Sequence, residues 1–183
     1  MSEEAPEVPS TKQIWFTADS HFNHANIIKY CKRPYSSADE MDRDLVKRWN
    51  AKVKKDDIVW HLGDFCLGSK DKTKKIFKKL NGQINLVMGN HDRHSLSFYY
   101  SIGFNRVHDR PVVLKDFFVL SHAPLGWVSD SLPFANIFGH VHGSELYKTF
   151  TARSACVCVE RWDYAPVLMD VLIAGMKKEE VDK

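Results

Sequence analysis

The stretch Ile14-Trp15-Phe16-Thr17, followed directly by Ala18-Asp19-Ser20-His21, sets the pattern for the whole chain. A short run of apolar and β-branched residues is typical of a buried strand. The polar residues that come next mark the end of that strand. Two of them, Asp19 and His21, have side chains that can bind a metal ion. The chain therefore begins its fold with a strand that delivers potential metal ligands at its carboxyl end.

Four further apolar runs repeat this unit of a strand followed at once by metal-capable residues. In chain order, residues 57–62 precede Gly63-Asp64, residues 84–88 precede Gly89-Asn90-His91-Asp92, residues 117–120 precede Ser121-His122, and Ile137-Phe138 precedes Gly139-His140-Val141-His142. The recurrence of one unit indicates a common site, because ligands of α/β proteins collect at the carboxyl ends of strands.

Helices are predicted between several of these strands. A short helix over residues 25–31 follows the first motif, and residues 69–80 predict another helix, ended by Asn81-Gly82. Ser37 and Glu40 form a capping-box pattern, after which apolar residues recur at helical spacing as far as Val53. Strands that alternate with helices predict an α/β fold. From Val112 onward strands dominate, which favours a mixed sheet, or two packed sheets with flanking helices, over a purely parallel one.

The bulk composition predicts one domain over residues 13–183, preceded by a flexible leader over residues 1–12. The 183 residues are 44% hydrophobic, without an apolar run near 18 residues or a secretory leader, so we expect a cytoplasmic protein without membrane contact. The four cysteines show no CxxC spacing, which predicts reduced thiols. A net charge of +3 favours an anionic substrate without demanding nucleic acid.

The candidate site residues share a position at the predicted strand ends, and they are Asp19, His21, Asp64, Asn90, His91, His122, His140 and His142. One residue separates Asp19 from His21, and His140 from His142, so an extended backbone would turn both side chains of a pair to the same side. A single pair of this kind arises easily by chance. Its recurrence after separate strands is what indicates a metal site.

Phosphate ester hydrolysis needs such a set of residues. The phosphorus atom is shielded by negative oxygens, and water is a poor nucleophile at neutral pH. Two divalent ions roughly 3.5 to 4 Å apart bring the pKa of bound water to about 7 and neutralise charge on the attacking and leaving oxygens. Imidazole and carboxylate ligands suit Mn, Fe or Zn better than Mg or Ca.

Taken in order, the five blocks resemble the motifs of the calcineurin-like metallophosphoesterase superfamily. Asp19-Ser20-His21-Phe22 with Asn26-Ile27-Ile28 is similar to its small, stand-alone bacterial and phage members. The segment Glu160-Arg161-Trp162-Asp163-Tyr164-Ala165-Pro166-Val167 extends the likeness over nearly the whole folded chain. The resemblance implies an α/β fold built as a four-layered αββα sandwich of two mixed sheets flanked by helices.

The resemblance also implies roles for single residues. Asp19, His21 and His142 would hold one ion, Asp64 would bridge to the second, and Asn90, His122 and His140 would complete the second site. The cofactor would be two divalent ions, with Mn preferred and Fe, Zn, Ni or Mg as alternatives. A hydroxide bridging the ions would attack in line, without a covalent enzyme intermediate. His91 would stay off the metals and protonate the leaving oxygen or stabilise phosphoryl charge.

Asp92 and Arg93 complete the catalytic candidates. The serine/threonine protein phosphatases carry Asp-Arg-Gly and a Glu where this chain has Leu67-Gly68-Ser69 and Asp92, which disfavours that substrate class. Leu67 also replaces the acidic residue that usually orients the histidine equivalent to His91, so Asp92, His24 or water stays open for that role. Arg93 is a candidate for pairing with a substrate phosphate.

Structural interpretations stand beside these functional ones. Any histidine taken alone is more often structural or exposed, and His61, His94 and His108 are interpreted in that way. The lysines between Lys70 and Lys79 predict the solvated side of a helix, with a nucleic-acid docking surface as the alternative.

The predicted function is a metal-dependent phosphohydrolase for a phosphomonoester or phosphodiester, with a nucleotide or small phosphorylated metabolite as the expected substrate. A protein-binding scaffold on the same fold and a nuclease or nucleic-acid phosphatase are the alternatives. The sequence leaves open the ester class, the native metal and the oligomeric state. Residues 106–111 and 124–133 form the loops that are expected to wall the pocket.

Overall fold

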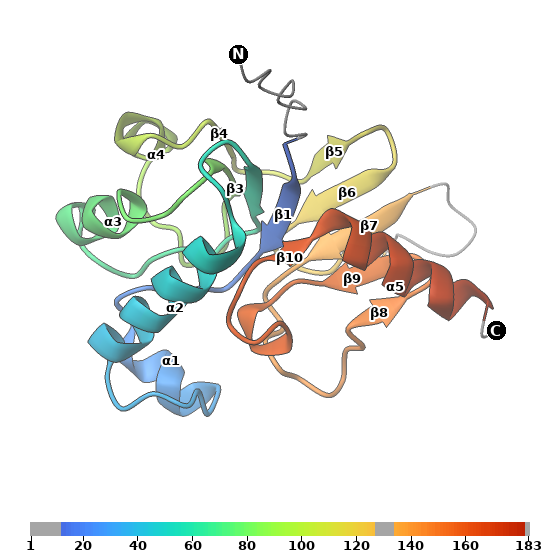
Figure 1. Cartoon of the computed structure of the whole chain (residues 1–183), viewed down its shortest axis with the longest axis horizontal. Coiled ribbons are helices and arrows are strands. Elements are labelled where there is room, and N and C mark those ends of the chain that lie inside the picture. Colours follow the sequence, from blue (N-terminus) through green and yellow to red (C-terminus); the bar gives the residue numbers. More distant parts are fainter. Residues whose placement is uncertain (1–11, 127–133, 182–183) are drawn as a thin grey trace, which may run out of the picture.

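The computed structural model describes residues 12–126 and 134–181 and arranges them as two five-stranded sheets with flanking helices (Figure 1). The predicted leader lies outside the described residues, apart from Lys12. Residues 127–133 of the predicted pocket loop lie outside them as well. The fold prediction is therefore tested on nearly all of the predicted domain.

The first sheet has the strand order β10-β1-β2-β3-β4. Strands β1 to β4 run parallel, and β10 pairs with β1 in the antiparallel direction. Its strands are β1 Ile14–Thr17, β2 Ile58–His61, β3 Gln83–Val87, β4 Arg106–His108 and β10 Val167–Leu168. Parallel pairing brings the carboxyl ends of β1, β2 and β3 to one edge, as the sequence motifs predict.

The second sheet has the order β5-β6-β7-β9-β8 and is also mixed. Strands β6, β7 and β9 are parallel, whereas β5 and β8 pair antiparallel at its two edges. Its strands are β5 Val112–Leu114, β6 Phe118–Ser121, β7 Ala135–Phe138, β8 Phe150–Thr151 and β9 Ser154–Cys156. The prediction of an α/β fold with two mixed sheets and helices is confirmed.

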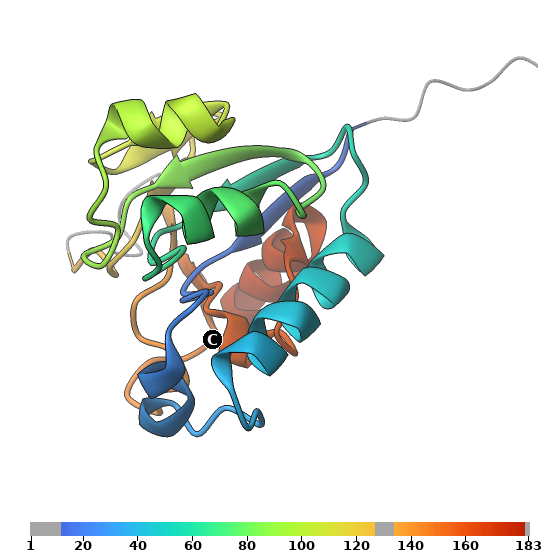
Figure 2. The ribbon, with the colours of Figure 1, turned by 90° about the vertical axis from the view of Figure 1, so that its left-hand side faces the viewer.

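The helices are α1 Ala25–Tyr30, α2 Ala38–Lys52, α3 Lys70–Phe77, α4 Leu96–Ile102 and α5 Met169–Val181, with one 3-10 turn at Val159–Arg161. The Ser37 hydroxyl accepts the Glu40 backbone N–H, which confirms the predicted cap of α2, and Ser69 and Ser95 cap α3 and α4 in the same way. Helices α2, α3 and α4 lie over the first sheet (Figure 2). Helix α5 contacts β8, β9 and β10. No helix in the described ranges is long and apolar enough to cross a membrane.

Alternating side chains of the first sheet supply two core layers. Trp15 and Val59 pack with the helices, whereas their neighbours Phe16 and Trp60 pack with the second sheet. This period of two follows from the pleat of a strand. A sheet that is buried on both faces has only its strand ends left for polar chemistry, and these ends carry the motif residues.

The loops that follow the strands are hydrogen-bonded to one another. The Asp19 N–H donates to the Gly63 carbonyl at 2.9 Å, and the His21 N–H donates to the Asp64 carbonyl at 2.9 Å. In the second sheet, the Gly139 N–H donates to the His122 carbonyl at 2.8 Å. Each motif is therefore held against a motif from a neighbouring strand.

Asp57 stabilises the opposite end of the first sheet. Its carboxylate accepts hydrogen bonds from the Gln13 N–H, the Trp15 indole and the Lys54 N–H at 2.9 to 3.1 Å. Burial would raise the pKa of Asp57, but these three hydrogen bonds outweigh it and lower the pKa. The carboxylate thus stabilises the fold above its unfolded pKa of about 3.9, and this contribution is lost as the pH falls through the lowered folded value.

Replacement of Asp57 by Ala should lower the free energy of unfolding at neutral pH by about 2 to 4 kcal/mol, because the buried Trp15 indole and two backbone N–H groups lose a charged acceptor. Urea denaturation followed by circular dichroism measures the change. The exposed neighbour Asp56 offers the control, and Asp56→Ala should stay within about 0.5 kcal/mol of the parent chain. Equal stabilities of the two variants would contradict this role of Asp57.

Candidate metal centre

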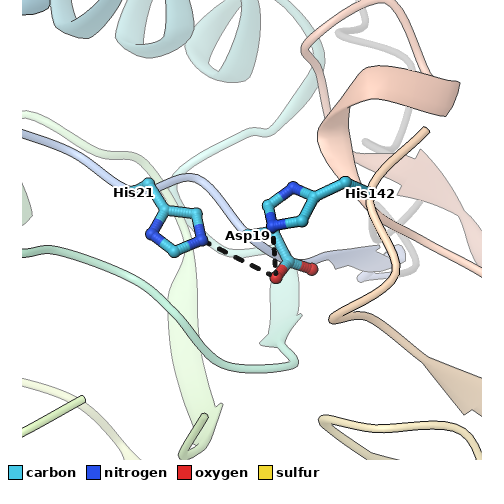
Figure 3. Close-up of side chains that lie close together, drawn as sticks. All are labelled: Asp19, His21 and His142. Atoms are coloured by element: carbon cyan, nitrogen blue, oxygen red, sulfur yellow. Dashed lines mark ion pairs between the residues drawn. The ribbon is translucent and has the colours of Figure 1, made fainter. Parts of the chain in front are cut away.

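Asp19, His21 and His142 meet where β1 ends and the loop after β7 returns. The two imidazoles approach the same carboxylate oxygen from either side (Figure 3). Asp19 Oδ1 lies 3.9 Å from His21 Nε2 and 3.8 Å from His142 Nε2. These separations are too long for hydrogen bonds and leave space among the three ligand atoms.

A second group of ligand atoms surrounds His122. Its Nε2 lies 3.5 Å from Asp64 Oδ2, 2.9 Å from Asn90 Oδ1 and 3.1 Å from His140 Nδ1. Asp64 Oδ2 also lies 3.4 Å from His21 Nε2, so it stands between the two groups. The structure therefore brings all seven predicted metal ligands into two adjoining groups.

The backbone reaches this arrangement differently from the prediction. Asp19, His21, His140 and His142 have φ values between 49° and 72°, and Asp64 has a φ of 55°. The expectation of extended backbone at the Asp19 and His140 pairs is wrong. Residues other than glycine rarely adopt left-handed backbone angles, because these angles are strained for them. Such residues cluster at functional sites. Tight turns rather than strand ends aim these side chains.

Two glycines allow the loops to approach the ligands closely. A Cβ atom at Gly139 would collide with Ala18 and lie 2.6 Å from Asp19 Oδ2. A Cβ atom at Gly89 would collide with Asp64 Oδ1 and lie 2.8 Å from the His122 ring. The site therefore needs glycine at these positions.

The first group contains buried polar atoms that have no hydrogen-bond partner among the described residues. Asp19 is fully buried, and its Oδ1 has no hydrogen-bond partner among the described residues. Both ring nitrogens of His21 are also buried without a hydrogen-bond partner among those residues. Burial raises the pKa of Asp19 to about 8 and lowers the pKa of His21 to about 2. Unpaired polar atoms that converge in this way fit a bound cation, which favours both the charged carboxylate and the neutral imidazole.

Comparison with known proteins agrees with this geometry. A family model described as calcineurin-like phosphoesterase matches residues 12–157, which span all of the ligand positions. The chain belongs to this family. An uncharacterized protein of the archaeon Methanocaldococcus jannaschii is 36% identical over 94% of this chain and 96% of its own length. The Gene 66 protein of Mycobacterium phage D29 is 36% identical over 44% of this chain and 40% of its own.

A solved structure extends the comparison to the whole fold. The crystal structure of a protein of unknown function from Aquifex aeolicus matches with a TM-score of 0.67 and 25% identity, over 88% of this chain and 97% of that one. The fold and the family are thereby shown, together with candidate Asp and His metal sites. These findings confirm the family that the sequence motifs predict.

The three catalytic candidates of this phosphoesterase family member occupy different environments. His91 is half-buried, and its ring centre lies 5.5 Å from that of His21. The backbone N–H of His91 donates to Asp64 Oδ1 at 2.8 Å. Asp92 is buried, and its carboxylate accepts the N–H groups of Asp64, Phe65 and Gly89 at 2.7 to 3.0 Å. Arg93 is exposed to solvent. Asp92 thus holds the Asp64 loop against the loop after β3.

The question of what orients His91 receives a partial answer. Within the described part of the chain, His91 Nδ1 is buried without a hydrogen-bond partner, and neither Asp92 nor His24 bonds to the ring.

His61 is buried, with its Nε2 2.9 Å from the Ser20 hydroxyl. Burial lowers the pKa of His61 to about 3, which keeps it neutral, in line with its predicted structural role.

Arg33 and Glu160 form a supporting layer that the residue patterns alone did not single out. Glu160 Oε1 lies 2.9 Å from His142 Nδ1 and accepts two hydrogen bonds from the buried Arg33 guanidinium. The same guanidinium donates to the carbonyls of Asp19 and Ser20. One buried cation therefore fixes both the loop of Asp19 and the carboxylate that orients His142.

Substitution of Glu160 by Gln should weaken one of the two metal-binding events by about 10- to 100-fold, since partners that orient a ligating histidine contribute at this level. Calorimetric titration of the metal-free chain with Mn²⁺ gives both dissociation constants. The exposed Glu145→Gln variant is the matched control and should bind like the parent. An unchanged pair of constants in Glu160→Gln would show that His142 does not depend on this contact.

Proposed function

We propose that this chain is a metal-dependent phosphohydrolase that cleaves a phosphomonoester or a phosphodiester. The observation that carries the proposal is the meeting of seven Asp, His and Asn side chains in two adjoining groups with Asp64 Oδ2 between them. The family is generally one of metal-dependent hydrolases, which supports the same reaction.

The two groups would hold two divalent ions. Asp19, His21 and His142 would bind the first ion, and the ligand atoms around His122 would bind the second, with Asp64 shared. When bound, such ions lower the pKa of coordinated water toward about 7 and neutralise charge on the phosphoryl oxygens. Imidazole-rich ligation favours Mn, with Fe, Zn, Ni or Mg as alternatives.

The protein's own side chains would supply positioning and a proton. Asp92 bonds three N–H groups and so keeps Asp64 between the two groups of ligands. The ring of His91 lies beside the ligands without joining them, which suits a residue that gives a proton to the leaving oxygen. Arg93 is exposed and close in sequence, so a contact with substrate phosphate stays a prediction.

The alternative functions have less support. A protein-binding scaffold would not need every ligand position together with His91, and this chain has them all. The lysines of α3 are exposed, while Thr73 and Ile76 face inward, which confirms the predicted solvated helix face. Docking of nucleic acid on that face stays the alternative interpretation, and the small phosphorylated substrate and the cytoplasmic location stay predictions.

Removal of metal provides the first test of the proposed function. Hydrolysis of 4-nitrophenyl phosphate and bis(4-nitrophenyl) phosphate should be abolished after treatment with a chelator and return on addition of Mn²⁺. Release of nitrophenolate measures the rate. Hydrolysis that persists in the fully metal-depleted chain would point to a different mechanism.

A second test separates His91 from the metal ligands. His91→Ala should retain two bound metal ions and reduce turnover by roughly 10² to 10⁴, the usual contribution of a positioned acid. Metal analysis and steady-state kinetics are measured on the same sample. His94→Ala serves as the control, because His94 contacts the Gly68 carbonyl and should leave both quantities unchanged. Loss of metal from His91→Ala would reassign His91 as a ligand.

A further inference from the structure

Two hollows border the ligand groups, one beside each group. The first, of about 340 Å³, is bordered by His142 together with Tyr30, Lys32 and Val141. The second, of about 380 Å³, is bordered by His122 and His140 together with a different set of residues. Because the two hollows touch different ligands, each lies beside a different one of the two proposed ion sites. Each reaches the lower end of the range for ligand pockets.

The second hollow has an apolar wall. Met88, Pro111 and Leu125 supply carbon surface beside His122, and Arg110 stands at the rim with its side chain 87% exposed. Pro111 and Leu125 belong to the two loops that the sequence predicts as pocket walls. Asp109 also borders this hollow, and its Oδ1 lies 3.8 Å from Arg110 Nε. An apolar surface beside an exposed guanidinium favours a planar aromatic group, which can pack on the wall and stack against the cation.

The first hollow carries a free aromatic ring. The side chain of Tyr30 is 73% exposed, although it is large and apolar, and its ring lies 6.4 Å from that of His24. Lys32 stands beside it with an exposed ammonium group. This side therefore offers a ring and a positive charge, so it can hold a second organic group near the ligands.

The number of organic groups on the phosphorus atom decides which substrates use both hollows. A monoester has one such group and three terminal oxygens, so it would leave one hollow filled with water. A diester has two groups and carries less negative charge. Contacts in both hollows add binding energy for the diester alone.

We propose that the preferred substrate is a phosphodiester with a planar aromatic group on the arm that enters the hollow of Met88, Pro111 and Leu125. This inference rests on the proposed function and narrows it to one ester class. Hydrolysis breaks one P–O ester bond, adds water across it and releases an alcohol and a phosphomonoester. The released monoester keeps contacts in one hollow only, which favours its departure.

Three esters with the same 4-nitrophenolate leaving group test the proposal on the Mn-loaded chain. They are bis(4-nitrophenyl) phosphate, methyl 4-nitrophenyl phosphate and 4-nitrophenyl phosphate. We expect kcat/KM for the first to exceed that of each of the others by about tenfold or more, the usual worth of a well-filled pocket. Leu125→Ala should reduce the advantage of the bis-aryl over the methyl ester, whereas the control Val113→Ala, at an exposed strand position, should retain it.

A binding measurement accompanies the kinetics. Diphenyl phosphate, which has poor leaving groups, should bind the Mn-loaded parent about tenfold more tightly than dimethyl phosphate in calorimetry, and Leu125→Ala should narrow this difference. Faster turnover of the monoester than of either diester would overturn the proposal, and so would an unchanged aryl advantage in Leu125→Ala. Failure to hydrolyse all three esters would instead reject the proposed function.

Discussion

The buried carboxylate of Asp19 is the constraint on which the rest of the site depends. It sits at the end of β1, fully enclosed, and its two oxygens have different surroundings. Oδ2 accepts the His140 N–H from the loop of the second sheet at 2.7 Å, while Oδ1 faces only imidazole nitrogens at longer distances. One side chain thereby joins the two sheets and leaves Oδ1 without a hydrogen-bond partner among the described residues, where a bound cation would stabilise the charged carboxylate.

The surroundings of this carboxylate are arranged to keep it in place. The Arg33 guanidinium donates a hydrogen bond to the carbonyl of Asp19. The Glu160 carboxylate contacts both that guanidinium and the ring of His142. On the other side, Asp92 takes three N–H groups from the loops of Asp64 and Gly89. Both layers consist of buried ionisable groups that each make several hydrogen bonds to the ligand loops, so they can hold strained, left-handed ligand residues in fixed directions. Rigid support of this kind is what a site for two closely spaced ions needs.

Much of this site could be predicted from sequence because its ligands follow apolar strands at once. A short apolar strand that is followed at once by Asp, His or Asn can be recognised in a local stretch of sequence. Parallel pairing then places the carboxyl ends of such strands together. The backbone at Asp19 and His142 could not be predicted in this way, because left-handed turns at these residues come from contacts between loops. Arg33 and Glu160 are 127 positions apart, so their pairing leaves no local pattern. Helices α4 and α5 were missed as well: α4 has only seven residues, and α5 carries apolar residues on several sides.

The central claim is that the seven side chains hold two cations at once, and anomalous scattering from crystals grown with Mn²⁺ tests it most directly. The account predicts two anomalous peaks roughly 3.5 to 4 Å apart, one beside Asp19, His21 and His142 and the other beside His122 and His140, with Asp64 between them. A single peak, or peaks outside these side chains in a fully loaded crystal, would contradict it.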